Sequence, residues 1–415
     1  MSRIETEGAA PLGGKAAGLR IALFSGNYNM VRDGANKALN RLVRYLLDHG
    51  AEVRVYSPTI PNPGFEPAGD LVSVRSVAIP TRKEYRLATG LSKRVKDDIR
   101  DFSPNVMHIS APDILGRKAQ TFAAELGVPV VASLHTLFQT YLTYYGLDFL
   151  RPMGERYLDR FYGRCDFVLA PNELLAQDLR KSTGLGDHIH IWSRGVDHNL
   201  WNPARRDMAW RRAHGYADDE VVLLFFGRLV KEKGLDVFED VVKALRARGR
   251  KVRPLVVGAG PAGDDLAGRI GEAVFTGHVE GAALARAVAS ADILINPSTT
   301  EAFGNVNLEA MASGIALISA EAPAARSLIG DGMTGLLVPP RDAAAYADAV
   351  EALMDDPARL RSFAKAGVEA SKAYRWSTIL DRVIDTYHLA VAEGPHLRDP
   401  KVQAVAARRR AMATA

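Results

Sequence analysis

Two glutamates, Glu301 and Glu309, are separated by seven residues in the stretch 298–314, which reads STTEAFGNVNLEAMASG. An apolar run that ends at Asn296 precedes them and helix-forming residues begin at Asn305, so we expect a buried parallel strand, a loop and a helix. A helix N-terminus presents unpaired N–H groups and a partial positive charge, which suit a phosphate. Glu301 can then hold sugar hydroxyls or a positive charge, while Glu309 can accept two ribose hydroxyls. The alternative is a loop acid and a capping acid that bind no ligand.

A second candidate site follows the apolar run 221–226, which has the composition of a central parallel strand. The next residues read GRLVKEKG and include Arg228 and Lys233. A guanidinium offers a bidentate fork and an ammonium a point charge, so the two residues can clamp a diphosphate at the end of the strand. The alternative is a polar loop before a helix.

The stretch 255–263, LVVGAGPAG, contains the spacing G-x-G-x-x-G after an expected strand. We do not interpret it as a dinucleotide fingerprint, because Pro261 interrupts the phosphate turn and no acidic residue follows at the distance that a ribose requires. A glycine-rich turn between a strand and a helix is the interpretation that remains.

In the first half of the chain, His135 and Gly34 follow expected strands. His135 comes directly after the strand 129–134, and ligands of doubly wound folds bind at the carboxyl ends of strands. Gly34 lies in the loop after the strand 20–25, where glycine allows the backbone to approach a ligand closely. The alternatives are a structural histidine and a turn glycine.

Strands and helical patterns alternate along the chain, which predicts an α/β protein with parallel sheets. At 415 residues the chain is long enough for two domains of ordinary size. We expect a flexible tail over residues 1–19, a first domain over 20–198, a second domain over 199–375, a helix over 376–395 and a basic tail over 396–415.

The composition, with 47% hydrophobic and 24% charged residues, predicts a soluble globular protein, and no apolar run approaches the ~20 residues of a transmembrane helix. The N-terminus has no signal-peptide pattern and the single cysteine, Cys165, cannot form an intrachain disulfide, so we expect a cytoplasmic location. The net charge of +5 suits anionic substrates or an anionic membrane surface. The sequence contains no nucleic-acid module, so no nucleic-acid partner is expected, and it predicts no oligomeric state.

Apolar residues recur at helical spacing through the segment 81–102, among seven Lys and Arg residues. A basic amphipathic helix can lie on anionic lipid, so peripheral contact with the inner face of the cytoplasmic membrane is one interpretation. Three aspartates, at 97, 98 and 101, dilute the positive charge. A solvated helix over a core stripe is the other interpretation.

The spacing of Glu301 and Glu309, followed by AMASG, resembles the Glu-x7-Glu signature of retaining glycosyltransferases of family 4. The GR…KG stretch at 227–234 and Gly-Val-Asp at 195–197 are also similar to that family, and the resemblance extends over residues 20–392. It implies a GT-B fold, in which two Rossmann-like, doubly wound parallel-sheet domains face a central cleft. The first domain would bind the acceptor, the second would bind the nucleotide sugar, and the helix 376–395 would cross back to the first domain.

The resemblance also implies roles for individual residues. The catalytic set would be His135, Glu301, Arg228 and Lys233. The donor-binding set would be Gly34, Arg194, Arg228, Lys233, Val279, Glu301, Phe303, Gly304, Asn305, Val306 and Glu309. The acceptor-binding set would be Arg82, Tyr85, Phe138 and Tyr141. The chain departs from the family in keeping one glycine at Gly34 and in having Pro323 and Ala324 in place of a glycine pair.

The implied activity is retaining transfer of a hexose from a nucleotide-diphosphate sugar to an acceptor hydroxyl. No Asp-x-Asp occurs, and His188 and His190 have no obvious third ligand, so we predict no metal and no cofactor besides the donor. The pattern is most similar to GDP-mannose-dependent α-mannosyltransferases and sulfolipid synthases, which favours mannose as the hexose and a lipid or glycolipid acceptor. The alternatives are a UDP-sugar-dependent enzyme acting on a lipid or polysaccharide precursor, a sugar-nucleotide epimerase and a non-catalytic nucleotide-sugar-binding module.

Overall fold

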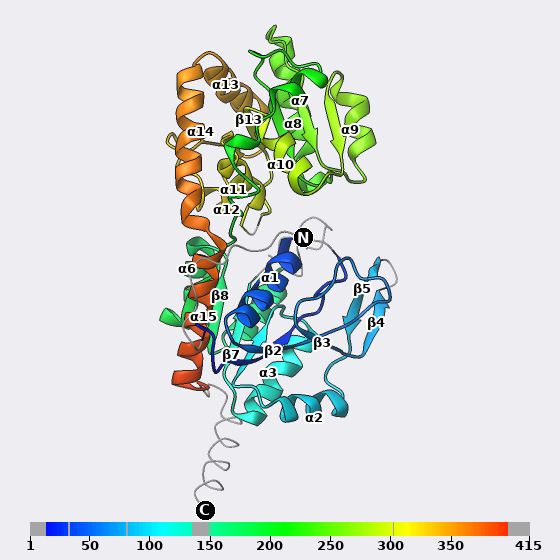
Figure 1. Ribbon diagram of the computed structural model, residues 1–415, viewed down its shortest axis with the longest axis vertical. Helices are drawn as coiled ribbons and strands as arrows, with labels where there is room; N and C mark the ends of the chain where they lie inside the picture. The colour runs from blue at the N-terminus through cyan, green and yellow to red at the C-terminus, as the bar shows by residue number, and fades with distance from the viewer. Residues whose placement is uncertain are drawn as a thin grey trace, which may run out of the picture. The chain divides into compact units, whose positions relative to one another are not determined.

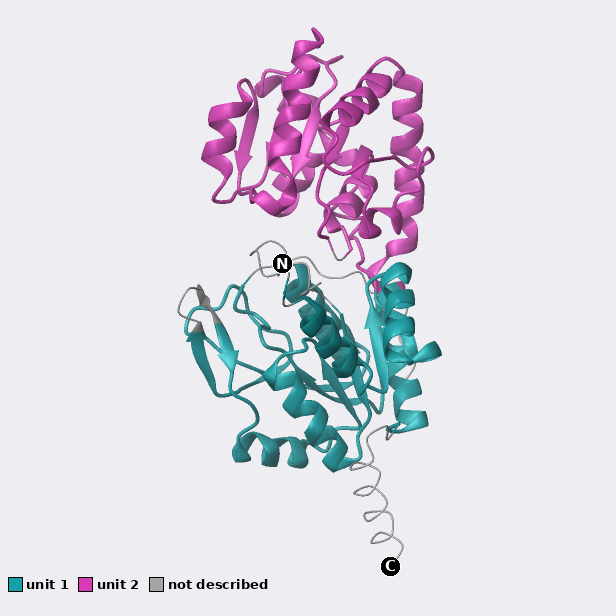
Figure 2. Cartoon of the chain, turned by 180° about the vertical axis from the view of Figure 1, so that it is seen from behind, with its two compact units in different colours: residues 1–192, 379–415 teal, residues 193–378 magenta. Residues whose placement is uncertain are grey.

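The computed structural model describes residues 14–31, 34–79, 82–134, 149, 151–301 and 303–396, with the backbone alone at 79 and 82–85. Its strands form two parallel sheets and a short hairpin, and helices pack along the sheets (Figure 1). The chain divides into two compact units (Figure 2). Unit 1 comprises Met1–Trp192 and Ile379–Ala415, and unit 2 comprises Ser193–Thr378.

Unit 1 contains a seven-stranded sheet in the order β3-β2-β1-β6-β7-β8-β9, in which all neighbours are parallel. Its strands are β1 (Arg20–Phe24), β2 (Glu52–Ser57), β3 (Asp70–Ser73), β6 (Val106–Ile109), β7 (Val130–Ser133), β8 (Phe167–Ala170) and β9 (Ile189–Ile191). The strand order changes direction between β1 and β6, as in doubly wound folds. A separate antiparallel hairpin pairs β4 (Ser76–Ile79) with β5 (Arg82–Ala88).

The local sequence determines where several helices of unit 1 begin and end. The side chains of Ser92, Asp113 and Asn172 accept hydrogen bonds from first-turn N–H groups of α2, α3 and α6. Gly127 and Gly184 end α3 and α6 in the left-handed conformation. The helices of this unit are α1 (Gly34–Asp48), α2 (Lys93–Phe102), α3 (Ile114–Leu126), α5 (Arg151–Tyr162), α6 (Glu173–Thr183), η2 (Gly186–His188) and α15 (Trp376–Glu393).

The expectation of one basic helix over residues 81–102 is wrong. The first part of this segment is the strand β5, and α2 begins only at Lys93. Gly90, with φ of +118°, turns the chain between the two elements, and the Ser92 side chain then caps the new helix. Val95 and Ile99 face the core on α2 as the helical spacing predicts.

Helix α15 is held to the unit 1 sheet by its apolar face and by two side-chain hydrogen bonds. Nδ1 of His190 lies 2.8 Å from Oγ1 of Thr386, and the Tyr387 hydroxyl lies 2.8 Å from Nδ1 of His108. His108 is fully buried on β6, and its other nitrogen lies 3.0 Å from Oγ of Ser133 on β7. Helix α15 therefore completes the core of the unit that the first strands begin.

Unit 2 contains a six-stranded parallel sheet in the order β12-β11-β10-β13-β14-β15. Its strands are β10 (Leu223–Phe226), β11 (Leu255–Val257), β12 (Val274–Gly277), β13 (Ile293–Asn296), β14 (Ala316–Ala320) and β15 (Leu336–Val338). Numbered within the unit, this order is the 3-2-1-4-5-6 order of dinucleotide-binding folds. The strands β10 and β13 are buried throughout or nearly so, which explains their all-apolar sequences.

Helices cover both faces of the unit 2 sheet, and two hydrophobic clusters lie between the helices and the strands. The helices are η3 (Pro203–Arg205), α7 (Met208–Ala213), η4 (Lys231–Lys233), α8 (Leu235–Ala247), α9 (Gly263–Ile270), α10 (Gly281–Ala289), α11 (Asn305–Ala312), α12 (Pro323–Arg326), α13 (Ala343–Met354), α14 (Pro357–Ser371) and η5 (Lys372–Tyr374). Among the described residues, no helix combines the length and the apolar composition that crossing a membrane requires.

Candidate active site

The two charged motifs of the second half of the chain meet at the switch point of the unit 2 sheet. Strands β10 and β13 are neighbours, while β11 continues the sheet on one side and β14 on the other. Ligands of open α/β sheets bind beyond the carboxyl ends of the strands at such a point. The loop 227–234 leaves β10 there and the loop 297–304 leaves β13. The fold thus brings Arg228, Lys233 and Glu301 to one edge of one sheet.

Gly234 brings these two loops into direct contact. It has φ of +74° and precedes α8, and a Cβ atom built on it would lie 2.7 Å from Cβ of Pro297. A residue with a side chain at this position would therefore push the loops apart as well as strain the backbone. The glycine that the sequence motif contains at this position is required by close packing.

Lys233 and Glu301 form an ion pair across the two loops, and this pair is the central feature of the site. The two side chains are 26% and 21% exposed, respectively, so solvent screens their attraction less than it would at an open surface. Arg228 is exposed on the same loop as Lys233, and the described residues offer it no ion-pair partner. The site therefore holds one neutralised acid and one cation that is available to an anion.

Helix α11 begins at this site, and its N-cap residue offers no side-chain acceptor to the first N–H groups. Gly304 occupies the N-cap position with φ of +92° and has no side chain with which to cap the helix. Open N–H groups at a helix N-terminus favour a phosphate. Glu309 is half-buried on the second turn, and the first turn contains no acidic residue, so the alternative of Glu309 as a capping acid is wrong.

A buried network of neutral polar side chains supports the loop that carries Glu301. Nδ2 of Asn296, at the end of β13, donates to Oδ1 of Asn307 on α11 at 2.8 Å. Nδ2 of Asn307 then donates to Oγ of Ser319 on β14 at 3.3 Å, and the backbone N–H of Ser298 donates to Oδ1 of Asn296 at 3.2 Å. The network connects β13, the loop, α11 and β14. The sequence carried a signal for it, since Asn307 is a polar residue on the buried face of an apolar helix.

The glycine pattern at 258–263 also acquires a structural explanation. A Cβ atom on Gly258, whose φ is +139°, would lie 1.9 Å from the backbone oxygen of Gly227. The turn after β11 therefore packs against the turn after β10, where the phosphate-binding candidates begin. The pattern serves backbone packing beside the site, in agreement with our rejection of a dinucleotide fingerprint.

Two protein-family models together match most of the chain. Residues 32–200 match the family described as Glycosyltransferase Family 4, and residues 220–356 match the one described as Glycosyl transferases group 1. The chain belongs to glycosyltransferase family 4.

Two relatives and one solved structure are similar to this chain over most of its length. The chain is 30% identical over 375 residues to sulfoquinovosyl transferase SQD2 of Arabidopsis thaliana, covering 88% of this chain and 72% of the relative. It is 30% identical over 376 residues to a GDP-mannose-dependent α-mannosyltransferase of Mycolicibacterium smegmatis, covering 89% and 97%. Among solved structures, sucrose-phosphate synthase from Thermosynechococcus elongatus superimposes with a TM-score of 0.71 at 21% identity, covering 90% of this chain and 99% of that one.

Membership of family 4 confirms the GT-B fold class and the prediction of a retaining hexosyltransferase that uses a nucleotide-sugar donor. It decides against the epimerase and against the non-catalytic binding module. The transferase has its two parallel sheets in the two units described above.

Other predicted donor residues of the transferase differ in accessibility. Phe303 is buried, and the centre of its ring lies 5.9 Å from that of Tyr374. Its side chain therefore anchors the loop 297–304 to the core. Arg194 is also buried. Val306, on the first turn of α11, and Val279, after β12, are half-buried and pack against the core. Within this set, Arg228, Lys233, Glu301 and the start of α11 are the groups that the structure brings together at the switch point.

The predicted residues of unit 1 are described only in part. Gly34 is the exposed first residue of α1. Arg82 and Tyr85 lie on β5, where the structure describes the backbone. His135, Phe138 and Tyr141 lie outside the described residues.

Asp113 is a candidate that sequence reasoning missed. It follows β6 and faces the turn after β1, where a Cβ atom on Gly26 would lie 2.2 Å from Oδ2 of Asp113. Burial raises the pKa of the Asp113 carboxyl, and hydrogen bonds from backbone N–H groups at the start of α3 oppose that shift. The residue lies at the switch point of the unit 1 sheet, but a polar residue before a helix looks like an ordinary cap in sequence.

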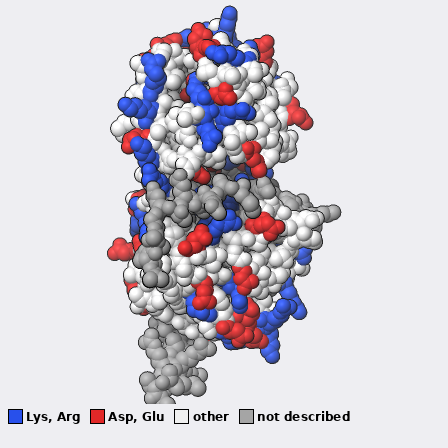
Figure 3. All heavy atoms as spheres, viewed as in Figure 1, with Lys and Arg blue, Asp and Glu red and all other residues white. Residues whose placement is uncertain are grey.

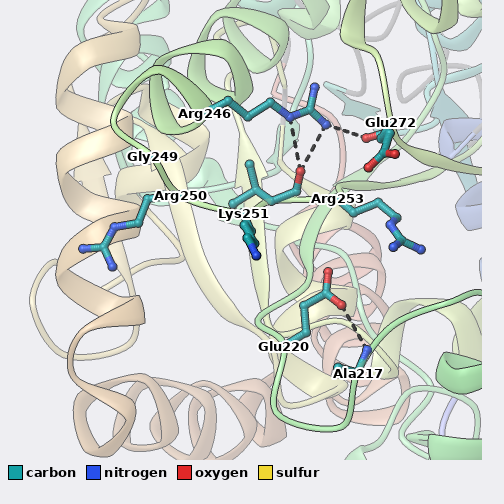
Figure 4. A pocket seen from close by; sticks show the side chains of 9 residues that line it. Ala217, Glu220, Arg246, Gly249, Arg250, Lys251, Arg253 and Glu272 are labelled. Atoms are coloured by element: carbon teal, nitrogen blue, oxygen red, sulfur yellow. Dashed lines mark hydrogen bonds between the residues drawn. The ribbon is translucent and has the colours of Figure 1, made fainter.

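A separate hollow of about 630 Å³ lies at the amino ends of strands in the unit 2 sheet (Figure 4). Its lining residues, which include Glu220, Arg253 and Glu272, precede the strands β10, β11 and β12. Arg246 in its wall is fully engaged by the backbone oxygens of Val252, Ile270 and Glu272. The hollow is thus at the amino ends of the strands, away from the carboxyl ends where the donor motifs lie.

Proposed function

We propose that this transferase moves mannose from GDP-mannose to a hydroxyl group of a lipid or glycolipid, with retention of configuration and without a metal ion. The observation that carries the proposal is the meeting of Arg228, Lys233, Glu301 and the uncapped start of α11 at one switch point. These groups offer positive charge and N–H donors to a diphosphate and a carboxylate to a sugar.

The donor and acceptor classes are supported by the names of relatives. GDP-mannose-dependent α-mannosyltransferases of Corynebacterium glutamicum and Mycolicibacterium smegmatis are 26% and 30% identical to the chain. A phosphatidyl-myo-inositol mannosyltransferase of Mycobacterium tuberculosis is 29% identical over 392 residues, covering 91% of this chain and 98% of the relative. Mannose is thus the sugar that several of these names share, and a lipid is the acceptor in one of them.

We assign the diphosphate to Arg228, Lys233 and the N–H groups of Gly304, Asn305 and Val306. Departure of the nucleoside diphosphate leaves positive charge on the sugar and negative charge on the phosphate. Arg228, Lys233 and the start of α11 stabilise the negative charge, which is the main role of the site in catalysis. The acceptor hydroxyl then attacks from the face that the phosphate leaves, and a phosphate oxygen receives its proton.

Glu301 and Glu309 take different parts of the donor in this proposal. Glu301 holds hydroxyls of the sugar, and Glu309 accepts hydrogen bonds from the ribose. The ion pair of Glu301 with Lys233 keeps both groups in place before the donor arrives. When the diphosphate binds, it supplies new negative charge to Lys233 and leaves Glu301 oxygens for the sugar.

The other predicted site residues are also part of this proposal. On the donor side they are Gly34, Arg194, Val279 and Phe303. On the acceptor side they are Arg82, Tyr85, Phe138 and Tyr141, and His135 remains a proposed catalytic residue.

Peripheral contact with anionic lipid is also proposed, with α2 as the candidate surface. This helix carries four basic and three acidic residues, and Figure 3 shows acidic and basic side chains side by side over it. Asp98 is engaged by Arg54 at 3.2 Å and by the Tyr56 hydroxyl at 2.8 Å, which leaves the basic residues in excess at the surface. The excess is small, so binding should weaken steeply as salt rises.

A donor panel followed by a transfer assay tests the proposal. Among GDP-, UDP- and ADP-sugars, GDP-mannose should raise the melting temperature of the full chain most, because a ligand that binds the folded state stabilises it. Labelled mannose from that donor should then appear in the organic phase when a membrane lipid extract is supplied. Stabilisation by UDP-glucose and not by GDP-mannose would overturn the donor, and label found only in water-soluble products would overturn the lipid acceptor.

A further inference from the structure

Three possible metal ligands meet at an edge of unit 1 that the transfer reaction does not use. His188 ends η2 just before β9, Glu393 ends α15, and His396 follows it by three residues. One ring nitrogen of each histidine and one oxygen of Glu393 all lie within 4.8 Å of one another. The two imidazole rings are nearly perpendicular, with centroids 4.6 Å apart. Among the described residues, this is the group of three such ligands that lies close enough to share an ion.

Buried Asp166 holds two of these residues in place. Its backbone oxygen lies 3.1 Å from Nδ1 of His188, and one of its carboxylate oxygens accepts a hydrogen bond from the backbone N–H of His396. The other carboxylate oxygen accepts from the backbone N–H of Val130 at 2.6 Å, so Asp166 is itself fixed to the sheet. The ring of Phe167 packs on His188 with centroids 4.7 Å apart. Outer contacts of this kind orient the imidazoles of metal sites.

Two imidazole nitrogens and one carboxylate oxygen suit a borderline divalent ion such as Zn²⁺, and they suit Mg²⁺ or Ca²⁺ poorly. Ligand atoms at 2.0–2.1 Å from a tetrahedral ion lie about 3.4 Å apart. In the structure, the Glu393 oxygen lies 2.9 Å from Nε2 of His396, which is within a small side-chain adjustment of that value. Nδ1 of His188 faces the Asp166 backbone oxygen, which can only accept a hydrogen bond, so Nε2 is the His188 nitrogen that remains for the ion.

We propose that His188, Glu393 and His396 bind one borderline divalent ion such as Zn²⁺, with water completing the coordination. The ion ties the end of α15 to the start of β9. Because Asp166 and His188 precede their strands, this site lies at the amino ends of the strands, whereas ligands of doubly wound folds bind at the carboxyl ends. The site is thus separate from the transfer chemistry, and it does not depend on the donor proposed above.

The experiment uses the full chain after EDTA treatment and transfer to chelator-free buffer. Equilibrium dialysis against Zn²⁺ or Co²⁺ should give one bound ion per chain, and bound Co²⁺ should show the visible absorption of a site with nitrogen and oxygen ligands. Glu393→Gln and His396→Ala should each weaken binding by at least ~10²-fold, because even outer partners of metal ligands contribute 10–100-fold. Zn²⁺ should also raise the melting temperature of the parent chain and leave that of these variants unchanged.

His388→Ala is the matched control. His388 is exposed on the same helix, and its Nε2 lies 2.7 Å from the backbone oxygen of Lys15. This variant should bind the ion as the parent does. The side chains of Glu393 and His396 are partly exposed, so their variants should melt like the parent when metal is absent. Failure of the parent to bind Zn²⁺ stoichiometrically, or equal binding by the parent and both ligand variants, would overturn the site.

Discussion

At the scale of single residues, the two glutamates of the motif should affect different ligands. Glu309→Gln removes one charged hydrogen bond to ribose, worth roughly 1.5–3 kcal/mol. It should therefore weaken the binding of both the sugar nucleotide and the free nucleoside diphosphate. Glu301→Gln should leave binding of the free diphosphate almost unchanged and lower turnover, because its contacts orient the reacting sugar. Calorimetry with the nucleoside diphosphate alone separates the two. Equal losses in both variants would show that the motif is a single phosphate-binding loop.

The cations of the loop after β10 support a second prediction at this scale. Arg228→Ala and Lys233→Ala should each lower turnover by at least ~10²-fold, the scale of losing one electrostatic stabiliser. Lys233→Ala should also lower the melting temperature slightly, because it leaves half-buried Glu301 without its partner. Lys231→Ala is the control, since this exposed residue lies on the same loop outside the proposed clamp. Near-normal turnover in both clamp variants would remove the diphosphate assignment.

At the scale of elements, Asn307 links α11 to two strands beneath the loop of Glu301. Asn307→Leu should destabilise the fold by about 1–3 kcal/mol, because it leaves buried polar partners on Asn296 and Ser319 unsatisfied. It should also lower kcat by up to ~10²-fold, the cost of misplacing a reacting group by about 1 Å. Ser319→Ala removes only hydrogen bonds of 3.3 Å, so it should lower both the stability and kcat by less. Denaturant unfolding and steady-state kinetics measure the two effects. Loss of stability with unchanged kcat would show that the network does not position the loop.

The contact of α15 with the sheet should respond to acid. Burial lowers the pKa of His108 to about 3, so the neutral ring is favoured in the folded state. Since an unfolded histidine titrates near 6.5, the unfolded chain binds more protons between these values, and the contribution to stability is complete above about pH 6.5 and declines as the pH falls toward 3. His108→Gln should lower stability at pH 7, but its stability should fall less steeply below pH 6.5, by about 1.4 kcal/mol per pH unit. Denaturant unfolding from pH 4 to 7 measures both slopes. The same slope in the parent and the variant would contradict the burial of an uncharged ring.

At the scale of the whole molecule, transfer should persist in excess EDTA at temperatures well below the melting point. The reason is that the diphosphate would be neutralised by Arg228, Lys233 and the start of α11. A glycosyl-transfer assay with and without the chelator measures this. Loss of activity that Mg²⁺ or Mn²⁺ restores would contradict the proposed mechanism. Loss that accompanies a lower melting temperature and that Zn²⁺ alone restores would instead report the site formed by His188, Glu393 and His396.

Much of the fold and part of the site follow from the sequence, for definable reasons. Arg228 and Glu301 lie in short motifs directly after apolar strands, so their place at strand ends could be predicted. The contact of Glu301 with Lys233 could not be predicted, because it depends on β10 lying next to β13, and apolar runs do not specify which strands pair. Segment 81–102 shows the limit of periodicity, since apolar residues four apart fit a strand, a glycine turn and a short helix equally well.

Residues that act across long chain separations escaped prediction altogether. Asn307 is a single polar residue whose partners lie on other elements, and Asp113 caps its own helix while it faces the distant turn at Gly26. His188 lacked a third ligand in sequence because Glu393 and His396 reach it only through the return of α15 to unit 1. Motifs that combine a strand, a loop and a helix are local, whereas these clusters exist only after the sheet has formed.

The return of α15 has a consequence for the order in which the protein is made. Unit 2 is one uninterrupted segment, so a growing chain holds all of it before the ribosome reaches the part of α15 that belongs to unit 1. Unit 1 lacks Leu380, Ile384 and Tyr387, all buried, until the ribosome has passed all of unit 2. Domains generally fold as units during synthesis. The first unit to be started is therefore the last to mature, and its unfinished apolar face is what a nascent-chain chaperone would meet.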